Sequence, residues 1–275
     1  MKTPIKYAMC NELYEAWSFE RVCDFLAQNG YKGVEVAPFT LAQDVREITA
    51  ERRERWRRVA EKSGVQITGL HWLLAKTEGY YLTSTDADVR KKTSDYFAEL
   101  IRLCADFNGS YMVLGSPKQR NLLPGVTKEQ AFDYAAEVLG SLVPLLEETK
   151  IVLAIEPLST AETDFITTAA EGVALMQKID APQQVALHLD CKAMSSESEP
   201  IPDLIRKYRK KMATFHANDP NLQGPGFGKL DFVPIMAALR EIDFAGWVSV
   251  EVFDYTPGPE RLTIESIEYM KHCDR

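Results

Sequence analysis

The chain has 275 residues, of which 45% are hydrophobic and 26% charged, as expected of a globular protein with a substantial core. Its formal net charge of -8 argues against non-specific binding to a phosphate backbone, so no nucleic acid partner is expected. The sequence has no run of roughly 18 apolar residues, so no membrane association is expected either. Its five cysteines are scattered and form no CxxC pair, which favours reduced thiols and a cytoplasmic location.

Short apolar segments alternate with amphipathic segments along the whole chain. The segments predicted to be strands are residues 5–9, 33–39, 65–74, 111–114, 151–155, 185–190, 213–217 and 247–253. Helices are predicted to follow the N-cap Ser18 and to cover residues 49–63, 93–107, 128–148, 168–179, 202–210, 232–242 and 259–272. This alternation predicts a parallel sheet, and eight units favour closure into a single (β/α)₈ TIM barrel. No linker interrupts the pattern, so residues 1–275 are predicted to form one domain.

Four consecutive predicted strands carry a side chain that can bind a metal ion at or near their C-terminal ends. These side chains belong to Glu156, Asp190, His216 and Glu251. Because the C-terminal ends of barrel strands surround one cavity, we expect the four residues to converge. Three carboxylates and one imidazole are typical of a site for Mn²⁺, Mg²⁺ or Co²⁺, with Zn²⁺ as the less favoured choice. Each residue alone could cap a helix or join a salt bridge, but a shared cation better explains four in succession.

Five further residues are predicted to face the same cavity and to bind the substrate. They are Glu162, His188, His71, Trp72 and Lys118. His188 precedes Asp190 by two positions, so in a strand both side chains lie on the same side of the sheet. His71 and Trp72 end the third predicted strand, where they would supply a polar contact and an apolar wall. The simpler alternatives are packing for the ring side chains, helix capping for Glu162 and a solvated loop position for Lys118.

The sequence resembles the xylose-isomerase-like TIM-barrel sugar (phosphate) isomerase/epimerase superfamily. The resemblance runs along essentially the whole chain, and the nearest branch is that of the ketose 3-epimerases. It is carried by the segments GVEVAPF, LAIEPLS, HLD, FHANDP followed by PGFGKLDF, and VSVEVF. The resemblance implies a (β/α)₈ barrel and one divalent metal ion held by Glu156, Asp190, His216 and Glu251.

The resemblance also implies roles for individual residues. In the ketose 3-epimerases, the carboxylates that match Glu156 and Glu251 act as an acid/base pair as well as metal ligands, and Glu162 matches a glutamate that contacts the substrate. Two positions depart from that branch. Ala193 stands where the branch has a substrate-binding histidine, which His188 is a candidate to replace, and Leu222 stands where it has an arginine. The resemblance therefore implies the metal site and the reaction class, but not the sugar.

These observations predict a divalent-metal-dependent sugar isomerase or epimerase that removes a proton next to a carbonyl and passes through an enediolate. The alternative on the same metal site is a dehydratase or lyase acting on a keto-sugar or keto-inositol. An abasic-site DNA endonuclease and a non-catalytic sugar-binding barrel are less favoured. The expected partner is a small sugar or sugar derivative. A homodimer is retained as an option, because barrels of this kind often pair through their outer helices.

Overall fold

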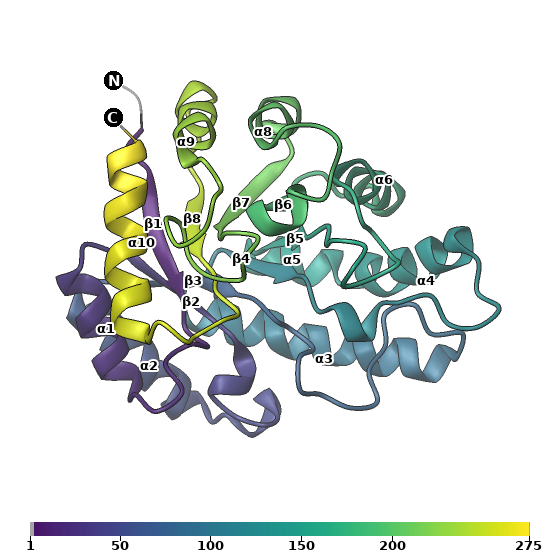
Figure 1. Cartoon of the computed structure of the whole chain (residues 1–275). Coiled ribbons are helices and arrows are strands. Elements are labelled where there is room, and N and C mark those ends of the chain that lie inside the picture. Colours follow the sequence, from purple (N-terminus) through teal and green to yellow (C-terminus); the bar gives the residue numbers. More distant parts are fainter. Residues whose placement is uncertain (1–2, 275) are drawn as a thin grey trace.

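The computed structural model describes residues 3–274, so residues 1, 2 and 275 of the predicted domain lie outside the described residues. Eight parallel strands follow one another around a closed barrel in chain order (Figure 1). The strands are β1 Lys6–Cys10, β2 Gly33–Val36, β3 Gln66–Leu70, β4 Tyr111–Leu114, β5 Val152–Ile155, β6 Val185–Asp190, β7 Met212–Ala217 and β8 Trp247–Val250. The predicted (β/α)₈ barrel is confirmed, whereas its extent as one domain over residues 1–275 stays a prediction.

Helices surround the barrel and connect its strands (Figure 1). The α-helices are α1 Phe19–Gln28, α2 Ala50–Ser63, α3 Ala87–Asp106, α4 Lys128–Gly140, α5 Val143–Thr149, α6 Ala169–Ile179, α7 Cys191–Met194, α8 Ile201–Tyr208, α9 Phe232–Glu241 and α10 Pro259–Cys273. Short 3₁₀ turns are η1 Pro38–Thr40, η2 Val45–Glu47 and η3 Pro117–Gln119. The predicted N-cap is confirmed, because Ser18 Oγ accepts a hydrogen bond from the backbone N–H of Arg21 at 3.2 Å.

The prediction of one helix over residues 128–148 is wrong. The structure has two helices there, because α4 ends at Gly140 and Pro144 lies in the first turn of α5. Proline lacks the N–H that a helix interior needs, and it is tolerated only where a helix begins. The helix predicted over 93–107 begins instead at Ala87, where Asp86 caps it by accepting a hydrogen bond from the N–H of Asp88 at 2.8 Å.

Strands β2 and β3 end earlier than predicted, so the residues after them belong to the mouth of the barrel. Pro38 opens the turn η1 instead of continuing β2. His71 and Trp72 follow β3, and Trp72 has a φ of +53°. A positive φ is uncommon for a bulky residue, and such strained positions often occur at functional sites.

Within residues 3–274, no helix is both long and apolar enough to cross a bilayer. All five cysteines are free thiols in buried positions. The start of β1 lies beside the end of α10, where the hydroxyl of Tyr7 donates a hydrogen bond to Asp274 at 3.3 Å.

Candidate active site

Each of the four predicted metal-binding residues lies at the C-terminal end of a barrel strand. Glu156 directly follows β5, Asp190 is the last residue of β6, His216 lies in β7 and Glu251 directly follows β8. The register of β6 and β7 places Asp190 opposite His216. All four side chains are buried, with exposed fractions from 0% to 6%. The closed sheet therefore brings residues from four strands to one end of the barrel.

Candidate ligand atoms from β5, β6 and β7 lie close together. One ligand atom each from Glu156, His188, Asp190 and His216 lies within 4.8 Å of the others. Glu251 joins this cluster through His216, whose Nδ1 is 3.1 Å from Glu251 Oε2. The structure thus gathers the four residues predicted for the metal and adds His188, which the sequence analysis assigns to substrate binding.

His188 has a buried side chain without a polar partner. Neither of its ring nitrogens has a hydrogen-bond partner among the described residues, and its ring centroid lies 4.1 Å from that of His216. Burial, and then the neighbouring His216, lowers the pKa of His188 well below its usual value. Its neutral imidazole therefore offers a lone pair that no described residue uses. An unpaired buried nitrogen is costly, so this position fits a cluster that holds a cation.

The carboxylates of the cluster repel one another. Burial, and then Glu251 and Asp190, raises the pKa of Glu156 well above its usual value. Burial and Glu251 also raise the pKa of Asp190 to about 6. Burial acts on Glu251 in the same direction, but His216, His71 and Lys192 together outweigh it and lower the pKa of Glu251. A divalent cation would offset this repulsion, and the oxygen-rich donor set fits a hard or borderline metal ion.

A buried glutamate contacts His216 from inside the barrel. Glu35 in β2 is 0% exposed, and its Oε1 lies 3.0 Å from Nε2 of His216. Its Oε2 accepts hydrogen bonds from the hydroxyls of Tyr111 at 2.6 Å and Ser249 at 2.5 Å. With a proton on Nε2 donated to Glu35, the Nδ1 atom of His216 faces Glu251 and the cluster. A carboxylate in this position orients a metal-binding histidine and increases its basicity.

Replacing Glu35 with glutamine is expected to weaken divalent-metal binding by about 10-fold. The amide can still hydrogen-bond to His216, but it carries no negative charge. Calorimetric titration with Mn²⁺ measures the change. Ser249→Ala removes one partner of Glu35 while keeping the charge, so this control should retain most of the affinity. Equal Mn²⁺ affinity in Glu35→Gln and the unaltered protein would rule out the proposed role of the charge.

Asp190 is held in place by two hydrogen bonds. Its Oδ1 caps α7 by accepting from the N–H of Ala193 at 2.7 Å. Its Oδ2 accepts from Nδ2 of the fully buried Asn218 at 2.5 Å. The carboxylate of Asp190 therefore has a defined orientation toward the cluster.

Glu156 is fixed by a buried arginine and a close glycine. Arg120 is 1% exposed, and its Nη1 donates to the carbonyl oxygens of Glu156 at 2.8 Å and Leu114 at 3.2 Å. Its Nη2 donates to the carbonyl oxygen of Ile166 at 3.3 Å. A Cβ atom on Gly115 would lie 1.6 Å from Oε2 of Glu156. Only glycine at this position lets the carboxylate of Glu156 pass so close to the backbone.

A small cavity of about 20 Å³ lies beside the cluster, and we call it the inner cavity. Glu156, Glu251, His71 and Trp72 all line it. Nε1 of Trp72 donates to Oε1 of Glu251 at 2.8 Å, so the tryptophan positions this carboxylate. Nε2 of His71 lies 2.8 Å from Oε2 of Glu12. Glu156 and Glu251 thus line the same cavity from the ends of two different strands, β5 and β8.

The predicted substrate residue Glu162 also lines the inner cavity, where it pairs with a lysine. Its Oε1 accepts a hydrogen bond from Nζ of Lys192 at 2.5 Å, and its Oε2 accepts one from the hydroxyl of Ser159 at 2.8 Å. Nζ of Lys192 also lies 4.2 Å from the ring centroid of Phe253, another wall residue of this cavity. The pair places one cationic and one anionic group beside the cluster.

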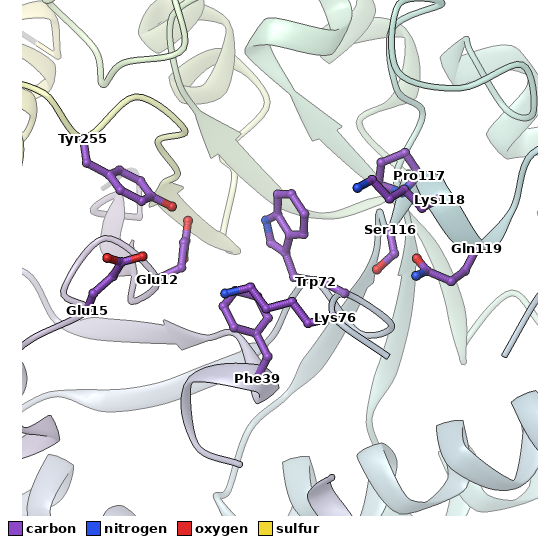
Figure 2. Close-up of a pocket in the computed structure, with 11 residues that line it drawn as sticks. Glu12, Glu15, Phe39, Trp72, Lys76, Ser116, Pro117, Lys118, Gln119 and Tyr255 are labelled. Carbon is purple, nitrogen blue, oxygen red and sulfur yellow. The ribbon is translucent and has the colours of Figure 1, made fainter. Parts of the chain in front are cut away.

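A larger cavity of about 360 Å³ adjoins the inner cavity, and we call it the outer cavity. Trp72 and Pro117 line both. Figure 2 shows Trp72 at the centre, with Lys118 on one side and Tyr255 on the other. The five residues predicted to bind the substrate are therefore divided among the two cavities and the cluster. Glu162 and His71 line the inner cavity, Lys118 lines the outer one, Trp72 lines both, and His188 belongs to the cluster.

Comparisons with known proteins identify the family. The model of the xylose isomerase-like TIM barrel family matches residues 23–273. The chain belongs to this family. It is 26% identical to a D-psicose 3-epimerase of Agrobacterium fabrum over 253 residues, which cover 89% of this chain and 85% of that protein.

Solved structures of low sequence identity share the fold. A D-psicose 3-epimerase from Clostridium cellulolyticum, solved with D-tagatose, superimposes with a TM-score of 0.84 at 19% identity and covers 98% of this chain and 100% of that chain. A 3-keto-D-glucoside 4-epimerase from Escherichia coli superimposes with a TM-score of 0.84 at 17% identity and the same coverage. Members of this fold thus include enzymes with different named substrates.

In this xylose isomerase-like barrel, the two positions that depart from the ketose 3-epimerase pattern contribute no polar side chain. Ala193 is buried, and its backbone N–H donates a hydrogen bond to Asp190. Leu222 is 44% exposed. Lys192, next to Ala193, instead places its ammonium group against Glu162, a wall residue of the inner cavity.

The sequence analysis did not assign roles to Glu35, Lys192 or Arg120. For Glu35 a signal exists, because a carboxylate inside the apolar segment Gly33–Val36 of a strand buried on both faces must find a buried partner. For Lys192 and Arg120 the sequence offers no signal of comparable strength. Glu162, the partner of Lys192, is 30 residues away, and Ile166, the most distant partner of Arg120, is 46 residues away.

Proposed function

We propose that this protein is a divalent-metal-dependent sugar epimerase that transfers a proton at the carbon next to a carbonyl. The observation that carries the proposal is the position of Glu156 and Glu251, which line one small cavity beside the cluster of Asp190, His188 and His216. Two carboxyl groups from different strands can serve the two faces of one carbon atom. The epimerase names of the relatives support the same reaction class.

Four residues would hold the metal ion: Glu156, Asp190, His216 and Glu251. Mn²⁺, Mg²⁺ or Co²⁺ suits this oxygen-rich set, and Zn²⁺ is the alternative. When bound, such a cation polarises a carbonyl and stabilises the negative charge that develops on the enediolate. The unpaired nitrogens of His188 make this residue the first additional candidate ligand.

The protein's own groups would carry the proton. One of Glu156 and Glu251 removes the proton from the carbon next to the carbonyl, and the other returns a proton to the opposite face. Trp72 keeps the carboxylate of Glu251 in place through its 2.8 Å hydrogen bond. Glu162, Lys192 and His71 would bind substrate hydroxyls around the inner cavity. The small inner cavity leaves space for about one water molecule, so a bound substrate would exclude bulk water.

The alternative reactions rank below this proposal. Dehydration or lyase chemistry on a keto-sugar or keto-inositol could begin with the same proton removal, but the named relatives are epimerases. Aldose–ketose isomerisation would need only one of the two carboxylates. A small sugar partner remains part of the proposal. A cytoplasmic location is also proposed, and the buried free thiols support it.

Proton exchange with solvent tests the proposed reaction. Protein loaded with Mn²⁺ is incubated with a panel of ketoses in D₂O, and deuterium next to the carbonyl is followed by NMR and mass spectrometry. We expect deuterium incorporation together with epimer formation, a loss of at least about 100-fold after chelation, and recovery on adding Mn²⁺. A product lighter by one water would indicate a dehydratase. Turnover that continues after chelation and without exchange would reject the proposal.

A further inference from the structure

Three cavities lie in series at the mouth of the barrel. The inner and outer cavities share Trp72 and Pro117 as walls. A third cavity, of about 420 Å³, shares Phe39 and Lys76 with the outer cavity, and also both glutamates of the β1–α1 loop. We call this third space the side cavity. The proposed chemistry uses only the inner cavity, so the outer and side cavities have no assigned ligand.

Aromatic rings line both unassigned cavities. Phe39, Trp72 and Tyr255 surround the outer cavity, as Figure 2 shows. The side cavity adds Tyr14, Trp17, Phe19 and Trp56. Flat aromatic faces beside a few polar groups provide a surface on which the C–H faces of a sugar ring pack.

The charges in the outer cavity balance one another. Two glutamates, Glu12 and Glu15, face two lysines, Lys76 and Lys118. Nζ of Lys76 lies 4.1 Å from the ring centroid of Phe39, so part of its charge is engaged by an aromatic face. A phosphate site would need an excess of donors and positive charge over carboxylates. The outer cavity therefore suits a neutral ligand.

Glu12 is a wall residue of both the outer and side cavities and, within residues 3–274, has one unpaired carboxylate oxygen. Its side chain is 5% exposed and lines both. Its Oε2 is engaged by His71 at 2.8 Å, whereas Oε1 has no hydrogen-bond partner among the described residues. A buried carboxylate oxygen without a donor is unfavourable, and a ligand hydroxyl would satisfy it.

We propose that the outer and side cavities bind a second ring, so that the substrate is a keto-sugar carrying a neutral glycosyl group rather than a free monosaccharide or a sugar phosphate. This inference rests on the proposed function, which places the carbonyl at Glu156 and Glu251. Only the reacting end of the first ring then reaches the inner cavity, which is small, and the rest of this ring lies on the Trp72 side of the outer cavity. The second ring packs on Phe39 and donates a hydroxyl to Oε1 of Glu12, with the aromatic walls of the side cavity beyond it.

Binding measurements separate this inference from the proposed reaction. The Mn²⁺-loaded protein is titrated calorimetrically with D-fructose, D-fructose 6-phosphate and 3-keto-D-glucose, and with isomaltulose, lactulose and 3-ketocellobiose, which carry a second neutral ring. We expect at least one disaccharide to bind about 10-fold more tightly than the matching monosaccharide. Fructose binding as tightly as isomaltulose and lactulose, together with 3-keto-D-glucose binding as tightly as 3-ketocellobiose, overturns the inference. Preferential binding of the phosphate also overturns it.

A variant pair identifies the surface that produces the preference. In Phe39→Ala, the ratio of disaccharide to monosaccharide affinity should fall by about 10-fold, because one stacking face is lost. Phe132→Ala, a half-buried aromatic on α4 that packs against Phe165, is the control and should leave the ratio unchanged. An unchanged ratio in Phe39→Ala overturns the inference. A disaccharide preference without deuterium exchange in any sugar supports the second-ring site and rejects the proposed reaction.

Discussion

Replacing Glu156 with glutamine is expected to lower the rate of proton exchange next to the substrate carbonyl by about 1,000-fold or more. The amide cannot accept or return a proton, and it is a poorer metal ligand than the carboxylate. Glu156 is buried and lines the inner cavity, so no bulk water is positioned to replace it. The measurement is deuterium incorporation from D₂O at saturating Mn²⁺, which separates the loss of proton transfer from weaker metal binding.

Glu137→Gln is the matched control for this experiment. Glu137 belongs to α4, where its side chain is 58% exposed and pairs with Arg90 at 3.0 Å. In this variant Arg90 keeps its hydrogen bonds to the carbonyl oxygens of Ser84 and Thr85. Glu137 does not line the inner cavity, so exchange should equal that of the unaltered protein. If Glu156→Gln retained more than about a tenth of the exchange rate at saturating metal, Glu156 could not be a member of the acid/base pair.

Replacing Gly115 with alanine is expected to reduce proton exchange by about 100-fold through displacement of Glu156. The added Cβ would lie 1.6 Å from Oε2 and 2.8 Å from Cδ of Glu156, so the carboxylate must move. Moving a catalytic group by about 1 Å can lower the reaction rate by about 100-fold. The rate of deuterium incorporation and the calorimetric affinity for Mn²⁺ should both fall, because Glu156 is proposed to act in both.

Gly140→Ala provides the matching glycine control. Gly140 is the last residue of α4, and a Cβ at this position meets no atom within 4 Å. Alanine there should leave exchange unchanged and alter the free energy of unfolding by less than about 1 kcal/mol. Normal exchange and normal Mn²⁺ affinity in Gly115→Ala would show that the close contact with Glu156 has no functional consequence.

Several features of the site could be predicted because their signals are local. Glu156 follows a five-residue apolar segment and precedes Pro157, and this pattern alone indicates the end of a buried strand. The same pattern at Asp190, His216 and Glu251 places all four at one end of a barrel, and the structure gathers them there. The prediction of a single helix over 128–148 was wrong because the helical periodicity of the sequence continues through Pro144, which lies in the first turn of a new helix.

The tertiary structure decided the contacts that join distant segments. Lys192 reaches Glu162 across 30 residues, and Glu35 reaches His216 across 181. The backbone of Glu156 is held by Arg120, a residue with no local pattern to distinguish it from a solvated arginine. These contacts depend on which loop lies beside which, and a pattern of apolar and polar residues along one strand does not contain that information.

By itself, the sequence determined the alternation of strands and helices, the closed barrel and the rim residues Glu156, Asp190, His216 and Glu251. Hydrophobic periodicity is a property of each segment, and a parallel barrel places every strand's C-terminal end on the same side. Only the tertiary structure decided that Glu251 pairs with Trp72, that His188 joins the cluster and that aromatic cavities extend outward from it. The physical reason is that side-chain hydrogen bonds and cavity shapes arise from packing between loops, which takes place after the local pattern has set the strands.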